Sequence, residues 1–116
     1  MSETDCLFCK IISGSIPSKK VFEDEDILAF HDITPVAPLH ILVIPKKHIK
    51  SIDEISEDDT LLIGKILHRI KLLAKEFGTN EKGYRIVNNC GDFGGQTVHH
   101  IHFHLLGGRH MTWPPG

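Results

Sequence analysis

Three histidines at alternate positions are the part of this sequence best suited to chemistry. His100, His102 and His104 alternate with Ile101, Phe103 and Leu105 in the run HHIHFHLL. Successive side chains of a β-strand point to opposite faces. A strand here would therefore place the three imidazoles on one face and the apolar side chains on the other. Spacing this regular argues against histidines that stand by chance on a solvated surface or in a core.

Two chemical interpretations of this histidine row remain, a metal site and a nucleophile site. Residues two apart on a strand lie about 6.6 Å apart, which separates His100 from His104 by roughly 13 Å. All three imidazoles can hardly converge on one ion with bonds of about 2 Å, although a neighbouring pair could. A histidine with a pKa of about 6.5 is mostly neutral at pH 7, so it can attack phosphorus without a separate strong base. The spacing therefore favours covalent catalysis by a histidine on a phosphorus atom.

A glycine-rich segment, residues 91–97, leads directly into the histidine row. It is not a P-loop, because no Gly-Lys-Ser/Thr follows the glycines. Glycines let backbone N–H groups approach a phosphate closely and can form an anion-binding nest. A plain hairpin turn is the alternative, but the adjacent histidines favour a phosphate loop in which Thr97 also stabilises phosphoryl charge. No carboxylate cluster for Mg²⁺ lies near, so no magnesium is expected to be required.

Length and charge limit the class of protein. The chain has 116 residues and a net charge of −2, which suits one domain and gives no reason to expect binding to a nucleic-acid duplex. The longest apolar run, Ile41–Ile44, is far too short to cross a bilayer, and the N-terminus does not resemble a signal peptide. We expect a cytoplasmic protein without a membrane partner, with the nucleus also open if the source is eukaryotic. In such a reducing compartment the three cysteines are not expected to form disulfides.

The hydrophobic patterns predict an α+β fold with an antiparallel sheet. A long helix is expected over 56–77, because Ser56 and Asp59 resemble a capping box and Gly78 can end the helix in a left-handed conformation. The other expected elements are a short helix over 5–12, strands over Lys20–Glu23, Ile27–His31, His40–Ile44, Tyr84–Asn88 and Ile101–Leu106, and an irregular tail over 107–116.

The chain resembles the histidine triad (HIT) superfamily, and within it the Hint branch of histidine triad nucleotide-binding proteins. The motifs that carry the resemblance are His100-x-His102-x-His104-Leu105-Leu106, residues 94–98, residues 28–33 and 42–48, and the tail Gly107-Gly108-Arg109 with Trp113-Pro114-Pro115-Gly116. The resemblance implies a single HIT domain over 1–116, with a sheet of about five antiparallel strands, one long helix and one short helix. It also implies that this sheet extends across a homodimer, that residues 1–4 are flexible and that the tail 107–116 reaches the partner subunit.

Members of this branch are purine nucleoside phosphoramidases, which cleave a P–N bond and release a nucleoside monophosphate such as AMP or GMP. The resemblance implies that His102 is the nucleophile and forms a nucleotidyl-histidine intermediate that water hydrolyses. His100 and His104 complete the triad, and His40 sits behind it and orients His102. No organic cofactor is implied. Two alternatives stay open: a HIT hydrolase of dinucleoside polyphosphates, and a nucleotide-binding regulatory module without catalysis.

The same resemblance assigns the nucleotide-binding residues. Asp32 would bind the ribose hydroxyls, because a carboxylate accepts hydrogen bonds from hydroxyl groups. Trp113 would reach toward the partner's site and shape the preference for a leaving group. Thr97 stands where many relatives have serine, and the third triad position is His104 rather than the glutamine of the uridylyltransferase branch, which favours hydrolysis over transfer. The phosphate would lie among His102, His104, Asn89, Gly95, Gln96 and Thr97, and the base among Ile33, Phe30, His31, Phe8 and Leu7.

Cys6 and Cys9 have the C-x-x-C spacing of zinc ligands. Many bacterial and protist relatives keep such a pair, and two histidines would be needed to complete a closed tetrahedral site. Relatives that contain zinc use the positions that match His48 and His100. We therefore expect a structural zinc that ties the N-terminal helix to the sheet. The alternative is a pair of half-buried thiols.

Overall fold

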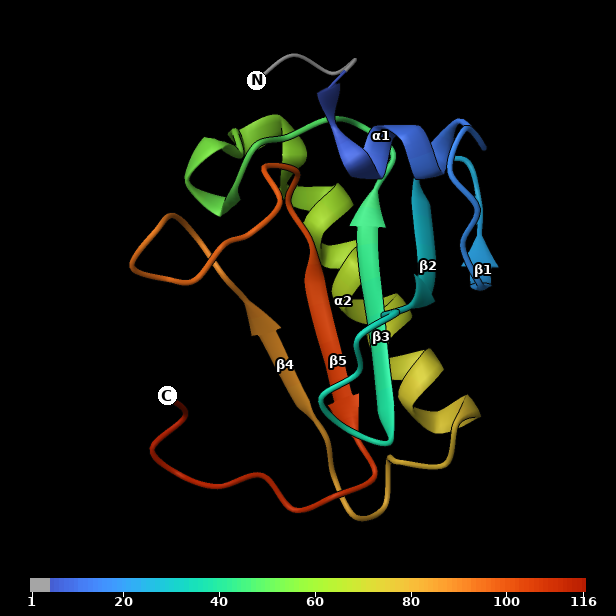
Figure 1. Cartoon of the computed structure of the whole chain (residues 1–116), viewed down its shortest axis with the longest axis vertical. Helices are drawn as coiled ribbons and strands as arrows, with labels where there is room; N and C mark the ends of the chain where they lie inside the picture. Colours follow the sequence, from blue (N-terminus) through green and yellow to red (C-terminus); the bar gives the residue numbers. More distant parts are fainter. Residues whose placement is uncertain (1–4) are drawn as a thin grey trace.

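The computed structural model describes residues 5–116 and contains a five-stranded antiparallel sheet with the order β1-β2-β3-β5-β4 (Figure 1). The expected α+β class, with one long and one short helix, is confirmed, while the expected flexibility of residues 1–4 lies outside the described residues. The elements are α1 (Leu7–Ile12), β1 (Lys20–Glu23), β2 (Ile27–His31), β3 (Leu39–Pro45), η2 (Ile52–Glu54), η3 (Glu57–Asp59), α2 (Thr60–Glu76), β4 (Arg85–Asn88) and β5 (Phe103–Gly107).

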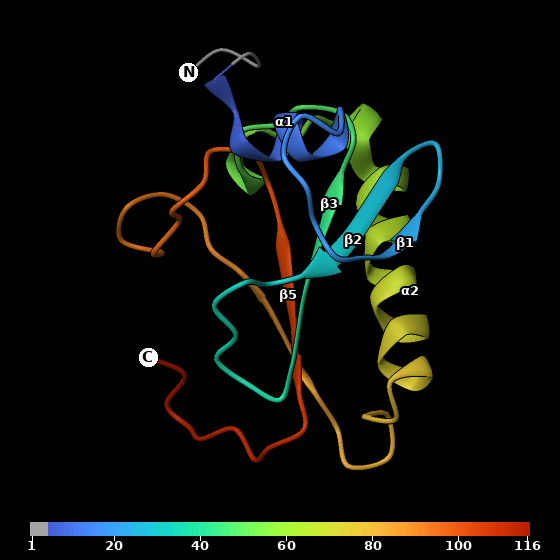
Figure 2. The same cartoon turned by 45° about the vertical axis from the view of Figure 1, so that its right-hand side comes forward.

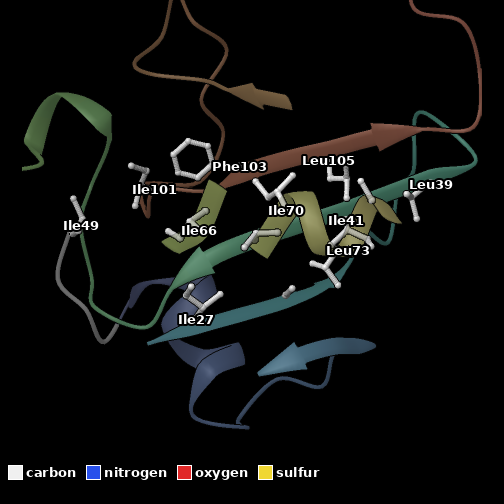
Figure 3. Packing of buried hydrophobic residues seen from close by; sticks show 13 residues of the cluster. Ile27, Leu39, Ile41, Ile49, Ile66, Ile70, Leu73, Ile101, Phe103 and Leu105 are labelled. Atoms are coloured by element: carbon white, nitrogen blue, oxygen red, sulfur yellow. The ribbon is translucent and has the colours of Figure 1, made fainter. Parts of the chain in front are cut away.

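The helix α2 runs along one face of the sheet, and its apolar stripe forms the main core with the strands it covers (Figure 2). Ile66, Ile70 and Leu73 of α2 point toward Ile41 of β3 and Leu105 of β5 (Figure 3). All five side chains are almost completely buried. Burial of this apolar surface is the main force that fixes the helix on the sheet.

Both ends of α2 have the predicted signals. The backbone N–H of Ser56 donates to the Asp59 carboxylate at 2.9 Å, as in a capping box, although one turn of 3-10 helix precedes the α-helix. At the other end Gly78 has φ +75°, a left-handed conformation that favours glycine. The N–H of Thr79 then donates to the carbonyl of Ala74 at 2.9 Å, which closes a Schellman motif.

The helix α1 lies across the end of the sheet at which β3 finishes, and packs on the face opposite α2 (Figure 1). Phe8 and Ile11 contact a second apolar cluster on this face. The cluster draws on alternate residues of two strands because strand side chains alternate between faces. Its strand residues are Leu28 and Phe30 of β2 and Leu42 and Ile44 of β3.

The predicted strand over Ile101–Leu106 is wrong at its start. The strand β5 begins at Phe103, so His100 and His102 precede it and only His104 lies within it. The backbone N–H of Ile101 donates to the carbonyl of Ile49 at 2.7 Å, so this amide pairs with the loop after β3 rather than with β4. Nevertheless, Ile101, Phe103 and Leu105 all join the α2 core, as the alternation predicted. Other element boundaries differ from the predicted ones by a few residues, which is ordinary at frayed ends.

Within residues 5–116, no helix is both long enough and apolar enough to cross a lipid bilayer.

Candidate active site and metal cluster

A pocket of about 240 Å³ opens beside the histidine row, between α1 and the end of β2. Its walls are mostly apolar, and its polar lining includes His102, His104 and Asp32. Such a cavity suits a ligand with a flat apolar part and a polar or charged end. The lining residues are Leu7, Phe8, Ile11, Ile16, Pro17, Ser18, Phe30, His31, Asp32, Ile33, Leu42, Thr97, Val98, His102 and His104.

His102 has one ring nitrogen fixed by the backbone. Its Nδ1 lies 2.8 Å from the carbonyl oxygen of His100, and because a carbonyl can only accept, Nδ1 carries the proton. In the neutral ring the lone pair is then on Nε2. Burial lowers the pKa of His102 below its ordinary value, against the opposing effects of the His100 carbonyl and the Asp32 carboxylate. The ring is therefore neutral at pH 7 and has a nucleophilic nitrogen.

His40 and His104 form a hydrogen-bonded pair behind this nucleophile. The N–H of Val36 donates to His40 Nδ1 at 3.1 Å, so the proton of neutral His40 is on Nε2. That Nε2–H donates to His104 Nδ1 at 2.9 Å, which leaves the proton of neutral His104 on its Nε2. Burial, followed by the neighbouring imidazoles of His102 and His40, lowers the pKa of His104 to about 4. His104 is thus a neutral donor whose ring centre lies 5.2 Å from that of His102.

The hydrogen-bond partner of His40 within the triad is His104, whereas the expectation was that His40 orients His102. The register of β3 and β5 pairs His40 with Leu106 and Leu42 with His104. His40 and His104 are therefore diagonal neighbours on one face of the sheet, within the reach of two imidazoles.

Asp32 borders the pocket next to this pair. Its Oδ1 accepts the N–H of Thr34 at 2.8 Å, and its Oδ2 lies 3.4 Å from His40 Nε2. Donor atoms of Asp32, His40 and His104 lie within 4.8 Å of one another, as in a metal site. However, the Val36 N–H fixes the proton on His40 Nε2, so that nitrogen has no lone pair for a metal. We interpret His40 and His104 as a hydrogen-bonded pair with the Asp32 carboxylate beside it.

A second group of side chains, which we call the thiol–imidazole cluster, consists of Cys6, Cys9, His48 and His100. The Nδ1 of His100 lies 3.3 Å from the Sγ of Cys6, 3.6 Å from that of Cys9 and 3.2 Å from Nδ1 of His48. The Sγ of Cys9 lies 3.3 Å from His48 Nδ1. Tetrahedral zinc with bonds of about 2.3 Å to sulfur and about 2.0 Å to nitrogen would separate its ligand atoms by about 3.3–3.8 Å. The four separations given above are close to this range, and all four donor atoms lie within 4.8 Å of one another, which fits a zinc site.

The ring of His100 is oriented for this cluster by the backbone. Its Nε2 lies 2.8 Å from the carbonyl oxygen of Pro45, so the proton is on Nε2 and the lone pair of Nδ1 points at the thiols. Burial lowers the pKa of His100 to about 4, which keeps the ring neutral. A neutral histidine whose outer N–H is bound by a carbonyl is the usual arrangement of a metal ligand. The donor set fits the predicted zinc.

The glycine loop differs from the expected anion nest. The N–H groups of Gly95 and Gln96 donate to the carbonyls of Asp92 and Gly91, both at 3.0 Å, so they are already paired inside the loop. The side-chain amide of the buried Gln96 accepts from the Gly91 N–H at 2.9 Å and donates to the backbone carbonyl of Lys50 at 2.7 Å. These residues brace the loop, and only Thr97 and Val98 at its end line the pocket.

Two further residues support the same loop. The Asn89 amide donates to the Gly94 carbonyl at 2.7 Å. A Cβ on Gly94 would lie 2.3 Å from the carbonyl oxygen of Cys90, so glycine is needed there for close packing within the loop. Asn89 thus acts in the structure as a brace of the loop rather than as part of the pocket lining.

The other predicted site residues either line the pocket or, like Trp113, lie outside it. Trp113 does not line the pocket of its own chain and is 80% exposed. The tail before it is held near β4, because Arg85 donates to the carbonyl of Thr112 at 2.8 Å. The predicted residues that do line the pocket are Leu7, Phe8, Phe30, His31, Asp32, Ile33, Thr97, His102 and His104.

Sequence reasoning missed part of the lining. Ile11 could have been found, because it lies one helical turn after Leu7 on the same face of α1. Ser18 could not, because only the folding of the α1–β1 loop brings it to the pocket. Its Oγ is buried and has no hydrogen-bond partner among the described residues. The other missed residues are Ile16, Pro17, Leu42 and Val98.

Known proteins resemble this chain over most of its length. A family model for the HIT domain matches residues 13–111. The protein of Arabidopsis thaliana called adenylylsulfatase HINT1 is 50% identical over 117 residues, covering 99% of this chain and 79% of that protein. A 14 kDa zinc-binding protein of Brassica juncea is 50% identical over 114 residues, covering 97% of this chain and all of that protein. The crystal structure of a HIT family hydrolase from Legionella pneumophila superposes with a TM-score of 0.95 at 59% identity, covering 97% of this chain and 100% of that one.

Proposed function

This chain belongs to the HIT domain family, and on that premise we propose that it hydrolyses the P–N bond of purine nucleoside phosphoramidates. The observation that carries the proposal is the hydrogen bond from His102 Nδ1 to the His100 carbonyl, 2.8 Å long. It leaves the lone pair of Nε2 for attack, in a side chain that borders a largely apolar pocket. Activation of a histidine nucleophile needs this combination of a fixed tautomer and a neutral ring.

In the proposed first step, His102 Nε2 attacks the phosphorus atom and the P–N bond breaks. His104 Nε2–H, the position at which the bond from His40 leaves that proton, donates a hydrogen bond to the leaving nitrogen, which takes its proton from solvent as the bond breaks. The product is a nucleotidyl-histidine and a free amine. In the second step water attacks the same phosphorus, its proton passes to solvent, and the P–Nε2 bond breaks to release the nucleoside monophosphate.

The substrate would lie along the pocket with its phosphate at the histidines. A purine suits the apolar end, where Phe8 and Phe30 lie edge to face with ring centres 5.7 Å apart. Asp32 has acceptor capacity for ribose hydroxyls in addition to its bond from Thr34. Thr97 would place its hydroxyl beside the phosphate.

The thiol–imidazole cluster would hold a zinc ion. Its four donor atoms fit tetrahedral coordination, and the similar protein of Brassica juncea is described as zinc-binding. When bound, zinc would supply a crosslink between α1, the loop after β3 and the segment before β5. Elemental analysis should find about one zinc per chain, and Cys6→Ser should lower that content. Protein without stoichiometric zinc, or a Cys6→Ser variant with unchanged content, would exclude the assignment.

We also retain the single-domain homodimer and cytoplasmic location as proposals. β4 is an edge strand of the sheet, and Trp113 on the adjoining tail is exposed, so both are accessible to a partner subunit. The cytoplasmic location rests on the expectation from the sequence that the cysteines are thiols, which persist in a reducing compartment. Sedimentation of the purified protein tests the dimer, and Trp113→Ala should change the preference among leaving amines if the tail enters the partner's site.

A second candidate reaction comes from the relative in Arabidopsis thaliana, which is called an adenylylsulfatase. The same attack by His102 on an adenylyl sulfate would expel sulfate instead of an amine. Sulfate leaves without needing a proton, so this reaction would depend less on His104 than P–N cleavage does.

The deciding experiment compares three substrates: an adenosine 5′-phosphoramidate, adenylyl sulfate and a diadenosine polyphosphate. We expect the highest kcat/KM for the phosphoramidate, and a denaturing quench should trap an adenylylated protein detectable by mass spectrometry. His102→Ala should lose both the turnover and the adduct, while His68→Gln, an exposed histidine on α2, should keep both. A preference for another substrate would replace the proposed reaction. AMP binding without any turnover would instead favour a regulatory module.

A further inference from the structure

The first turn of α1 supplements the apolar packing of Phe8 and Ile11 in holding this helix on the sheet. Six residues are far fewer than the roughly 12–15 at which an isolated helix becomes even marginally stable. Cys6 is the N-cap, and its Sγ accepts the N–H of Cys9 at 3.3 Å. Both thiols of the thiol–imidazole cluster therefore stand at this first turn. Whatever fixes the two sulfur atoms also fixes the helix.

The same helix forms one side of the pocket. Leu7, Phe8 and Ile11, which we call the α1 wall, all line it, and α1 lies across the end of the sheet at which β3 finishes (Figure 1). Phe8 lies between the two cysteines in the sequence. Its buried ring stands edge to face with His100 at 5.9 Å and with His102 at 5.1 Å between ring centres. One side chain thus contacts both the cluster and the nucleophile.

His100 provides a second connection. Its Nδ1 belongs to the thiol–imidazole cluster, and its carbonyl oxygen accepts the hydrogen bond of His102 Nδ1. A shift of His100 would therefore move the acceptor that sets the tautomer of the nucleophile. The backbone of a single residue joins the two sites.

We propose that zinc in the thiol–imidazole cluster raises the affinity of the pocket for a purine nucleotide by holding the α1 wall against His102, with Phe8 as the positioning residue. The identity of the ligand rests on the proposed function. Without an ion, the thiol–imidazole contacts of the cluster are weak hydrogen bonds, and α1 opens more readily. Coupling between two binding sites is reciprocal, so a nucleotide must raise zinc affinity by the same factor.

The first test measures AMP affinity by calorimetry on zinc-loaded protein and on the same protein after a chelator has removed zinc. We expect zinc removal to weaken AMP binding by about 10-fold, within the usual range of such couplings. Hydrogen exchange at residues 8–12 should become faster, while the buried turns of α2 should keep their protection. A competing chelator should also need a correspondingly higher concentration to remove zinc when AMP is present.

The second test identifies the role of Phe8. Phe8→Leu keeps an apolar side chain on the α1 wall but removes the ring that touches His100 and His102. We expect unchanged zinc content, together with a ratio of AMP affinities, zinc-loaded over zinc-free, that falls toward 1. The matched control His68→Gln should keep the ratio of the unmodified protein.

A third test uses folded, metal-loaded protein in case the zinc-free chain does not fold. Cobalt(II) takes the same ligands, and its thiolate absorption reports the geometry of the cluster. AMP should change that spectrum in the unmodified protein and not in Phe8→Leu. The proposal would be overturned by equal AMP affinity with and without zinc, or by a cobalt spectrum that does not change when AMP is added. Protein that binds no zinc would also overturn it. No arm measures hydrolysis, so failure of the proposed reaction would be seen separately, as AMP binding without turnover.

Discussion

Two groups of imidazoles lie side by side in this protein and are prepared for opposite tasks. In the thiol–imidazole cluster, the Nδ1 atoms of His48 and His100 face each other at 3.2 Å and face two thiols. In the second group, His40 donates to His104 at 2.9 Å, and His102 donates to a carbonyl at 2.8 Å. In the first group, nitrogen lone pairs and thiols face a common centre. In the second group, hydrogen bonds fix which ring nitrogen carries the proton.

The difference comes from backbone partners and not from residue type. The carbonyl of Pro45 holds the proton of His100 on Nε2, whereas the carbonyl of His100 holds that of His102 on Nδ1. Two histidines of one short motif therefore expose different nitrogens. The chemistry of each histidine is therefore set by which of its ring nitrogens is hydrogen-bonded to the backbone.

The largest expected effect comes from His102→Ala, which removes the one proposed nucleophile. Phosphoramidate hydrolysis should fall at least about 10³-fold, because the covalent route is lost. Zinc content, measured by elemental analysis, should stay that of the unmodified protein, since His102 belongs to the second group. Turnover within tenfold of normal would show that His102 is not the nucleophile. A loss of zinc would show that the two groups do not act independently.

A smaller effect is expected from His40→Ala, which removes the donor that orients His104. We expect kcat for the phosphoramidate to fall about 10- to 100-fold with a smaller change in KM, because His104 would lose its fixed tautomer. His40→Gln should recover part of the rate, since an amide can accept from Val36 and donate to His104. If the glutamine variant is as slow as the alanine variant, His40 does not act through this hydrogen bond.

Acid should weaken the folded state through the second group. The unfolded chain protonates His104 near pH 6.5, but the folded chain does so only at about 4, and burial also lowers the pKa of His40. Between these values the unfolded chain binds more protons, so the free energy of unfolding decreases as pH falls from 7 toward 5. Urea titrations over this range should show the decrease, and His104→Gln should reduce its slope. A slope unchanged in that variant would contradict the assignment.

The smallest effect is expected at Ser18, whose buried hydroxyl has no hydrogen-bond partner among residues 5–116. Ser18→Ala should leave the free energy of unfolding within about 0.5 kcal/mol of normal, because no bond is lost. Urea titration measures this directly. A loss well above 1 kcal/mol would show that the hydroxyl makes a bond in solution.

Most of the fold could be predicted because its signals are local. The apolar spacing and end signals of α2 gave the long helix, and alternation assigned Ile101, Phe103 and Leu105 to the face that α2 covers. The start of β5 could not be predicted this way. Its position depends on the bond from Ile101 to Ile49, residues that lie far apart in the sequence.

The residue types available for chemistry can be read directly from the chain: three histidines at alternate positions, a C-x-x-C pair and a glycine loop leading into the histidines. How these residues are used depends on the folded arrangement. In the fold, His40 donates to His104, and Ser18 lies in the pocket lining. The N–H groups of Gly95 and Gln96 form hydrogen bonds within their own loop. The physical reason is that residue type and local spacing are properties of the chain, whereas the partner of each ring nitrogen and backbone amide is set by strand register and packing between distant segments.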